Sequence, residues 1–552
     1  MNNNKLYSPK KTKNGVLFCY IGDETTKSVS IAGIFNNWDK SINYFKKDKD
    51  GVWKTTIKLP KGRHLYKYVI NDNDWILDPT NPTISEDCQN NSSITVTNDG
   101  QVLIKRKNIN KTNHSFMYKN FNAIRSPLWV KKAVIYQLDI KSFTENGFLG
   151  LKEKLAYLKE LGINALWIMP FCEIGIEKRV GEYGDPYAVE DFYSIDSQIG
   201  TKKDFLDFVS NAHSLNFKII MDFPINRASI DCNLTKTNPD WFTKNTDGQI
   251  YYAIPGRDYF AGFDFTNNDL KKYLIECFKY WINEFNIDGF RFDDTDMTPH
   301  DFLLQLSNDL KETKNDILLI SQSYDEFHNA ESFDLTYEGG FRDIFRDIIF
   351  SEKTQNDFIE YYNLQKFSFP KDSLRLRWLE EKEQGRIIEI FGEQALYPVI
   401  TVFYTLDSVP MLIMGQEFSD TKWKNWTSLF NKFSLDWDNF NNNLFNHYKK
   451  ILQIRNNNIA FTECGLEIIK NDNHKVISFV RFCENKVFLI IANLSNKEVK
   501  FKLSLKNINN LQITDKYTCI NLLNSKKEQI NLKRDNLFLR GYENKVLEIK
   551  NI

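Results

Sequence analysis

Short segments with alternating polar and apolar residues occupy the first hundred positions of the chain. Residues 52–59 and 64–70 alternate in this way, and each segment ends at a turn rich in Pro, Gly, Asn or Asp. Strands of this length, separated by such turns, are typical of a small β-sandwich, which we predict over residues 1–100. The residues that follow are polar and basic without clear periodicity, so we predict a linker over residues 101–128.

The pattern changes beyond this linker. Continuous apolar runs, such as residues 166–169 and 219–221, alternate with segments whose apolar residues recur at helical spacing. Such runs indicate parallel strands that helices cover on both faces. Repetition of the strand–helix unit over residues 129–460 predicts an α/β fold, the closed (β/α)8 TIM barrel, with catalytic groups at the C-terminal ends of the strands. Alternation returns in residues 461–552, where we predict a second β-sandwich.

Composition and charge narrow the class of function. The chain has 72 basic and 72 acidic residues, so its formal charge is zero. Proteins that bind nucleic acid or a membrane surface normally carry a basic excess, so we expect neither partner. The eight cysteines are scattered without a Cys-x-x-Cys pair, which indicates reduced thiols. No apolar segment has the length of a signal peptide or membrane span, so we expect a cytoplasmic protein.

Four motifs lie at the predicted strand ends. They are Tyr183-Gly184-Asp185-Pro186-Tyr187, Asp222-Phe223-Pro224-Ile225-Asn226, Gly289-Phe290-Arg291-Phe292-Asp293 and residues 410–417. In this order they resemble motifs of the α-amylase family, glycoside hydrolase family 13. The resemblance implies a retaining reaction on α-glucans with Asp293 as the nucleophile. It also implies substrate-binding or orienting roles for Tyr187, Asp222, Asn226 and Arg291.

Three further motifs lie in the predicted N-terminal sandwich. They are Gly33-Ile34-Phe35-Asn36-Asn37-Trp38, Leu65-Tyr66-Lys67-Tyr68 and Trp75-Ile76-Leu77-Asp78-Pro79. Together they resemble the glycogen-binding module of carbohydrate-binding module family 48, in which two tryptophans stack on sugar faces while a lysine and an asparagine bind hydroxyls. The residues at the matching places are Trp38, Lys67, Trp75 and Asn90 or Asn91. The alternative, that both tryptophans belong to the sandwich core, is disfavoured by the polar turn residues that precede them.

The acid/base position departs from the family pattern. The family's strand-five glutamate corresponds to Gln322, directly after an apolar run. A retaining mechanism needs two carboxyl groups, one of which gives and takes a proton. An amide does neither at neutral pH. Asp325 and Glu326 follow in the adjoining loop and are alternatives for a substitute acid/base, whereas strand alternation predicts that Asp294 points away from the barrel interior.

Three more pocket positions change in charge or length. After strand seven, the resemblance places Glu383 at the position of the aspartate that binds the transition state, and Lys382 at that of a sugar-binding histidine. After strand three, a second histidine becomes Arg227. Two permanent cations therefore replace both histidines, and we expect at least one of them to form an ion pair with a carboxylate of the pocket. The candidate carboxylates are Asp222, Asp293 and Glu383.

Two functions remain open at this point. The missing glutamate favours an α-glucan-binding protein, for starch or glycogen, with an impaired or lost glycosidase site. The alternative is an active retaining α-1,4-glucan hydrolase or transglycosylase with an atypical acid/base. The new cations also allow a phosphorylated or otherwise anionic sugar. Calcium is common in the family, but no cluster of ligands stands out, so we expect no metal and no cofactor. The sequence does not define the oligomeric state.

Overall fold

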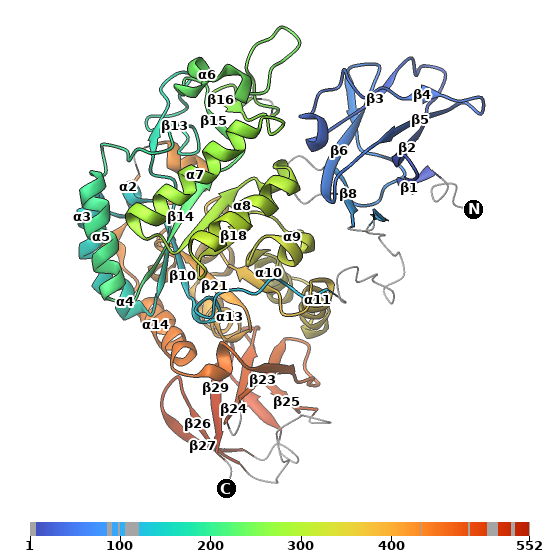
Figure 1. Ribbon diagram of the computed structural model, residues 1–552. Helices are drawn as coiled ribbons and strands as arrows, with labels where there is room; N and C mark the ends of the chain where they lie inside the picture. Colours follow the sequence, from blue (N-terminus) through green and yellow to red (C-terminus); the bar gives the residue numbers. More distant parts are fainter. Residues whose placement is uncertain are drawn as a thin grey trace.

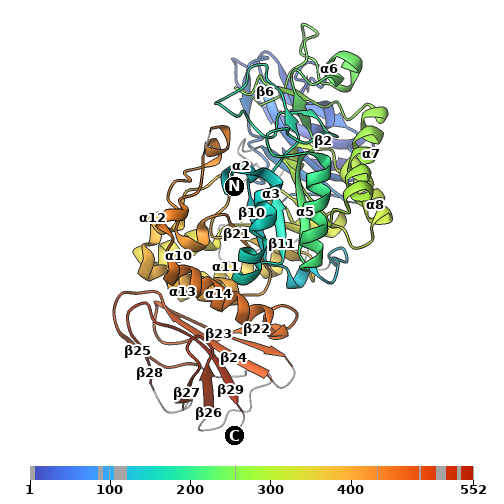
Figure 2. The same ribbon diagram turned by 90° about the vertical axis from the view of Figure 1, so that its left-hand side faces the viewer.

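A central barrel lies between two β-rich domains (Figure 1). The computed structural model describes residues 7–84, 91–97, 100–104, 121–254, 256–431, 433–483, 486–504, 517–530 and 536–550. The N-terminal β domain lies beside the barrel (Figure 1), and the C-terminal β domain lies below it (Figure 2), where β24 and β29 contact α13. The predicted α/β fold with β-rich flanking domains is therefore confirmed. The domain boundaries at residues 100, 129 and 461 stay predictions.

Within the described ranges, eight parallel strands close the barrel in chain order. They are β10 (Ile135–Leu138), β11 (Ala165–Ile168), β14 (Lys218–Pro224), β17 (Gly289–Asp293), β18 (Leu318–Ser321), β19 (Leu335–Glu338), β20 (Leu374–Arg377) and β21 (Val409–Ile413). The pairing of β10 with β21 completes the ring. In the register of β14 with β17, Asp222 lies opposite Arg291 and Pro224 opposite Asp293. This register brings two of the predicted site motifs to the same end of the barrel.

Helices surround the barrel because each strand–helix unit places one apolar helix face on the sheet. The longer helices are α3 (Gly147–Glu153), α4 (Leu155–Leu161), α5 (Lys202–Ser214), α7 (Asn268–Phe285), α8 (His300–Thr313), α10 (Phe341–Phe350), α11 (Gln355–Ser368), α13 (Glu393–Thr405) and α14 (Asn442–Asn456). Helix α7 shows the principle, since Leu274, Phe278 and Trp281 are buried on one face and the side chain of Asn267 caps its N-terminus. Within the described residues, no helix is both long and apolar enough to cross a bilayer.

Short elements connect these units. The short helices are α2 (Ile140–Phe143), α6 (Leu234–Thr237), α9 (Glu326–Glu331) and α12 (Ile387–Phe391). Two small antiparallel sheets have two strands each: β12 (Glu173–Ile174) with β13 (Val189–Asp191), and β15 (Arg227–Ser229) with β16 (Phe260–Gly262). Arg227 is the first residue of β15, where it lies opposite Gly262 of β16.

The N-terminal β domain, which we call the N-terminal module, is a two-sheet sandwich. One sheet contains β1 (Lys10–Thr12), β2 (Gly15–Ile21), β5 (Val52–Ile57) and β4 (Lys46–Lys47), in that order. The other contains β3 (Val29–Gly33), β6 (Gly62–Ile70), β7 (Asp74–Ile76), β8 (Ser92–Val96) and β9 (Val102–Leu103). Its core is formed by Phe18, Ile31, Tyr66, Tyr68 and Ile94 with their buried neighbours.

The C-terminal β domain contains one large sheet and one strand pair. The sheet order is β22 (Gly465–Ile468), β23 (Val476–Cys483), β24 (Lys486–Asn493), β29 (Asn544–Lys550), β26 (Tyr517–Asn521) and β27 (Lys526–Ile530). The pair is β25 (Val499–Phe501) with β28 (Leu537–Leu539).

One cysteine pair corrects the expectation that all thiols are reduced. Cys464 and Cys483 form a disulfide, with their Cα atoms 5.4 Å apart. Pairing of β22 with β23 sets Gly465 opposite Phe482, so the neighbouring residues of the two strands meet across the hairpin. Nineteen residues separate the two cysteines in sequence, which is why their spacing gave no signal. Cys88 lies outside the described residues, and the other described cysteines are free and buried.

Candidate functional site

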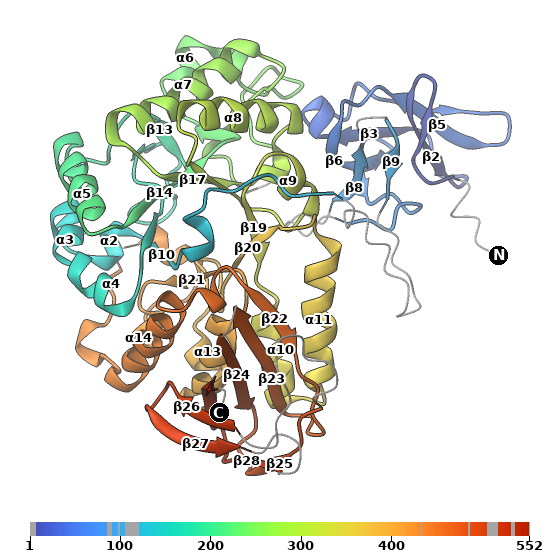
Figure 3. The ribbon, with the colours of Figure 1, turned by 60° about the horizontal axis from the view of Figure 1, so that its bottom comes forward.

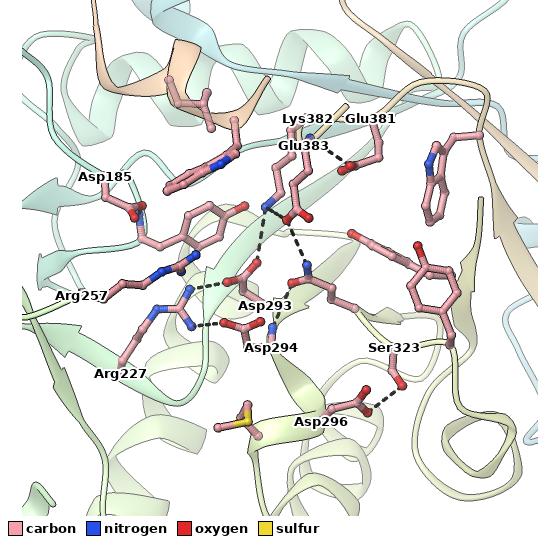
Figure 4. A pocket seen from close by; sticks show the side chains of 18 of the residues that line it. Asp185, Arg227, Arg257, Asp293, Asp294, Asp296, Ser323, Glu381, Lys382 and Glu383 are labelled. Carbon is pink, nitrogen blue, oxygen red and sulfur yellow. Dashed lines mark hydrogen bonds and ion pairs between the residues drawn. The ribbon is translucent and has the colours of Figure 1, made fainter. Parts of the chain in front are cut away.

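A cavity of about 380 Å³ opens at the C-terminal ends of the barrel strands (Figure 4). This volume lies within the range of small-molecule sites. Its wall includes six residues that the sequence singled out: Tyr187, Arg227, Asp293, Gln322, Lys382 and Glu383. Aromatic side chains complete the wall, namely Tyr324, Tyr337, Trp378, Trp426 and Phe430. The cavity therefore combines apolar ring faces with convergent charged groups, as sugar-binding sites require.

Three cations surround Asp293, the last residue of β17. Arg291 and Arg227 both donate to its carboxylate, and Nζ of Lys382 lies 3.6 Å from Oδ1. Burial raises the pKa of Asp293, but the charges of Arg291, Lys382 and Arg227 outweigh it and hold this pKa well below its usual range. Nζ of Lys382 also lies 3.2 Å from Oε1 of Glu383. The expected ion pairs are confirmed, and neither new cation points into solvent.

Asp222 lies one layer behind the cavity and is fully buried. Oδ1 accepts from Arg291 at 2.8 Å, and Oδ2 accepts from the hydroxyl of Tyr187 at 2.6 Å and from Nε1 of Trp167 at 3.0 Å. Asn226 is buried beside Arg227 and accepts from its Nη1 at 2.8 Å. The described residues that line the cavity do not include Asp222, Asn226 or Arg291. Their contacts hold the cavity wall in place.

The amide of Gln322 forms hydrogen bonds at both ends. Its Oε1 accepts from the backbone N–H of Asp294 at 3.0 Å, and its Nε2 donates to Oε1 of Glu383 at 3.2 Å. A carboxylate in this place would face Glu383 with like charge, whereas the amide supplies a donor there. Both contacts of Gln322 suit an amide, which itself gives up no proton at neutral pH.

Asp294 corrects the expectation that it points away from the barrel interior. It lines the cavity, and Nη1 of Arg227 lies 2.8 Å from its Oδ2. The backbone of Asp294 is left-handed, with φ of 48°, so strand alternation already ends at Asp293. Burial and the neighbouring charge of Asp293 raise the pKa of Asp294, although Arg227 opposes this shift. Figure 4 shows both carboxylates facing Arg227.

Glu381 is a wall residue that sequence reasoning did not single out. It is buried, and its Oε1 accepts from the backbone N–H of Glu383 at 2.9 Å. Burial and the charge of Glu383 raise the pKa of Glu381 to about 8. The acidic residues around Lys382 were visible in the sequence. Their neighbours along the chain do not show that Glu381 is buried whereas Glu383 is half-exposed.

The substitute acid/base candidates lie away from the cavity. Asp325 caps the short helix α9 by accepting from the backbone N–H of Phe327 at 2.7 Å, and Glu326 is buried in the first turn of that helix. Neither is among the described residues that line the cavity. Glu383, which is 47% exposed, is the carboxylate next to Gln322.

The two tryptophans of the N-terminal module are neighbours. Their ring centroids are 6.5 Å apart with an angle of 37°, and neither belongs to the sandwich core of the described residues. Trp75 is 42% exposed, whereas Trp38 is half-buried against the barrel, where it shares a small cavity with Tyr252 and Phe263. Lys67 lies on β6, in the sheet that also contains Trp75. Of the two asparagines, Asn91 is buried and Asn90 lies outside the described residues.

Comparison with known proteins agrees with this geometry. Residues 142–261 match the family model for the alpha amylase catalytic domain, and residues 18–102 match the model for the glycogen recognition site of AMP-activated protein kinase. Alpha-amylase 2 of Dictyoglomus thermophilum is 24% identical over 428 residues, which cover 70% of this chain and 74% of that protein.

Solved structures extend the similarity. A noncanonic maltogenic alpha-amylase from Thermotoga neapolitana is 29% identical with a TM-score of 0.71, covering 77% of this chain and all of the other. A maltogenic amylase from S. marinus covers 97% of each chain with a TM-score of 0.67 at 16% identity, so the fold is shared along nearly the whole length. An alpha-amylase catalytic domain, matched over residues 142–261, and an N-terminal glycogen-recognition module, matched over residues 18–102, are therefore both found in this chain.

Proposed function

We propose that this protein binds α-glucan chains at the N-terminal module and at the barrel mouth, and that it hydrolyses them slowly or not at all. One observation carries the proposal: the residue at the acid/base position is Gln322, and both ends of its amide are hydrogen-bonded. General acid–base catalysis contributes about 10²- to 10⁴-fold to rate, and an amide contributes none of it.

The charge around Asp293 supports the same conclusion. A retaining glycosidase reaction passes through a transition state with positive charge on the sugar ring. An active site accelerates a reaction by complementing that charge. Here Arg227 and Lys382 add two buried positive charges beside the carboxylate that would attack the sugar. These cations weaken the nucleophile and disfavour a cationic ring.

Binding does not require either catalytic group. The cavity is large enough to hold part of a sugar chain, and its aromatic wall offers apolar faces to the C–H groups of a glucose ring. The alpha-amylases and maltogenic amylases among the relatives support an α-glucan as the ligand. We infer that the scaffold keeps its ligand class after the proton-transfer step is lost.

Comparing two substrates tests the proposal. We expect purified protein to hydrolyse maltoheptaose at background rate, because the leaving oxygen needs a proton and Gln322 has none to give. An α-glycosyl fluoride, whose leaving group departs without a proton, tests the nucleophile separately. Gln322→Glu should restore little activity, since Arg227, Lys382 and Glu383 remain. Robust turnover of maltoheptaose by the unmodified protein, lost in Asp293→Asn, would overturn the proposal.

One observation keeps an active hydrolase or transglycosylase as the second candidate. Oε1 of Glu383 lies 3.2 Å from Nε2 of Gln322, so a carboxylate lies beside the acid/base position. In that case Glu383 would transfer the proton and Asp293 would attack the sugar. Turnover of maltoheptaose that disappears in Glu383→Gln would favour this second candidate.

The N-terminal module gives a prediction of its own. We expect Trp75→Ala in the full chain to weaken glycogen binding about 5- to 100-fold, because truncation of an aromatic anchor typically costs about 1–3 kcal/mol. Retardation on glycogen-containing native gels measures this change. Phe538→Ala, which removes an exposed ring in the C-terminal domain, is the matched control. Equal retardation of both variants would remove Trp75 from the binding surface.

A further inference from the structure

Three consecutive residues at the start of β6 are among those through which the N-terminal module contacts the barrel. Nζ of Lys61 lies 2.6 Å from Oε2 of Glu331 in α9. Gly62 approaches α8 so closely that a Cβ atom there would lie 2.5 Å from Cβ of His300. Arg63 follows and is only 7% exposed. Figure 3 shows the module beside α8 and α9.

Arg63 joins two loops of the barrel mouth. Its Nη1 lies 2.6 Å from Oδ1 of Asp296, and its Nε lies 2.9 Å from Oδ2 of Asp325. Asp296 lies in the loop after β17, and Asp325 in the loop after β18. Within the module, Nε of Arg63 also donates to the hydroxyl of Ser93 at 3.0 Å. A guanidinium with several donors in one plane suits this bridging of two carboxylates.

Asp296 is part of the wall of the barrel cavity (Figure 4). Its Oδ1 accepts from the hydroxyl of Ser323 at 2.7 Å and contacts Nε2 of His328 at 3.1 Å. Ser323 directly follows Gln322, and its hydroxyl accepts from the backbone N–H of Asp325 at 3.0 Å. Asp296 therefore links Arg63 to Ser323, the residue next to the acid/base position.

We infer that Arg63 is a positioning residue of the barrel's sugar site: the N-terminal module supplies the cation that holds the wall segment of Asp296 and Ser323 in place. The inference rests on the proposed function in that the cavity binds α-glucan. Without Arg63, two carboxylates would face each other in a region of low solvent access. Their repulsion would move the loops after β17 and β18, and with them one wall of the cavity.

Lys61 provides the matched control. Its ion pair belongs to the same contact between module and barrel, but Glu331 is not among the described residues that line the cavity. Loss of Lys61 therefore loosens the contact without removing a cation that pairs with a residue of the cavity wall. If sugar binding weakens when Arg63 is replaced but not when Lys61 is replaced, the cause is the position of the cavity wall and not a looser contact between module and barrel.

The experiment measures maltoheptaose binding by calorimetry in a full-length Trp75→Ala parent, so that the module's own site contributes little. We expect Arg63→Met to weaken binding at least about tenfold, Arg63→Lys to weaken it less, and Lys61→Met to change it by less than about twofold. In an Asp296→Asn background the effect of Arg63→Met should shrink, because the two residues act on the same wall. Equal affinities for Arg63→Met and Lys61→Met would overturn the inference.

Hydrogen exchange separates failure of the inference from failure of the proposed function. If the parent does not bind maltoheptaose, α-glucan binding by the barrel is wrong, and amide exchange in residues 294–298 and 322–325 then tests the positioning role by itself. Faster exchange in Arg63→Met but not in Lys61→Met supports the inference. Unchanged exchange in both variants contradicts it.

Discussion

Replacing Arg291 with methionine is expected to lower the free energy of unfolding by about 3–5 kcal/mol at neutral pH, the usual cost of breaking a buried ion pair on one side. Arg291 is fully buried and bridges Asp222 and Asp293. Asp293 keeps Arg227 and Lys382 as partners, so most of the cost comes from Asp222. That carboxylate would keep its two neutral donors, Tyr187 and Trp167, without a cation. Urea unfolding followed by circular dichroism measures the change.

Arg346 offers the matched control because it also pairs with two aspartates, Asp343 at 2.8 Å and Asp347 at 2.9 Å, but on the surface. Arg346→Met should lower stability by less than about 1 kcal/mol. A loss at Arg291 as small as the loss at Arg346 would show that the buried network stabilises nothing.

The loss of unfolding free energy in Arg291→Met should also depend on pH. A carboxyl whose pKa is lowered in the folded state stabilises the protein above its ordinary pKa, and this contribution is lost as pH falls toward the lowered value. In the unmodified protein Asp293 has such a lowered pKa. Arg291→Met lacks one of the cations that lower this pKa, so its stability falls less in acid. The difference in free energy of unfolding between the two proteins should therefore narrow below about pH 3.9.

Glu381→Gln is expected to stabilise the protein increasingly as pH rises. Burial and the charge of Glu383 raise the pKa of Glu381 from about 4.5 to about 8. In this interval the unfolded chain releases the proton while the folded protein retains it, so each pH unit costs roughly 1.4 kcal/mol of stability. Glutamine does not titrate, and its Oε1 can still accept from the backbone N–H of Glu383. The gain of the variant should reach roughly 3–5 kcal/mol by pH 8.

Unfolding curves at pH 5, 6, 7 and 8 test this second expectation. Glu389→Gln is the control, because it removes a glutamate from a half-exposed ion pair with Lys424 and not from the buried wall. A stability difference for Glu381→Gln that stays constant over these pH values would mean that Glu381 titrates normally.

The barrel could be predicted from its most apolar strands, but two strands gave no such signal. Strands β11, β14 and β18 each contain a continuous apolar run, which is typical of a parallel sheet covered on both faces. Strands β19 and β20 alternate apolar with polar residues. Their polar residues are nevertheless buried because Glu338 lies opposite Arg377 across the strand register, with Oε2 and Nε 2.7 Å apart. A charge that is neutralised by a neighbouring strand some forty residues away in the sequence has no signature in the local sequence.

In the candidate site, too, some residues could be predicted from the sequence and others could not. The replaced histidines and Gln322 occupy positions that motifs define, so the ion pairs of Arg227 and Lys382 could be predicted. Asp294 could not, because its direction depends on a left-handed backbone at the strand end. Arg63 comes from a domain more than two hundred residues away from Asp296, and only the docked structure brings the two together.

The contact made by Arg63 limits how this chain can change during evolution. Here loss of the module would leave Asp296 and Asp325 without their shared cation, and an exchanged module would need a guanidinium at the same place. We therefore expect recombination at the domain boundary to disturb the barrel mouth unless both parts are inherited together.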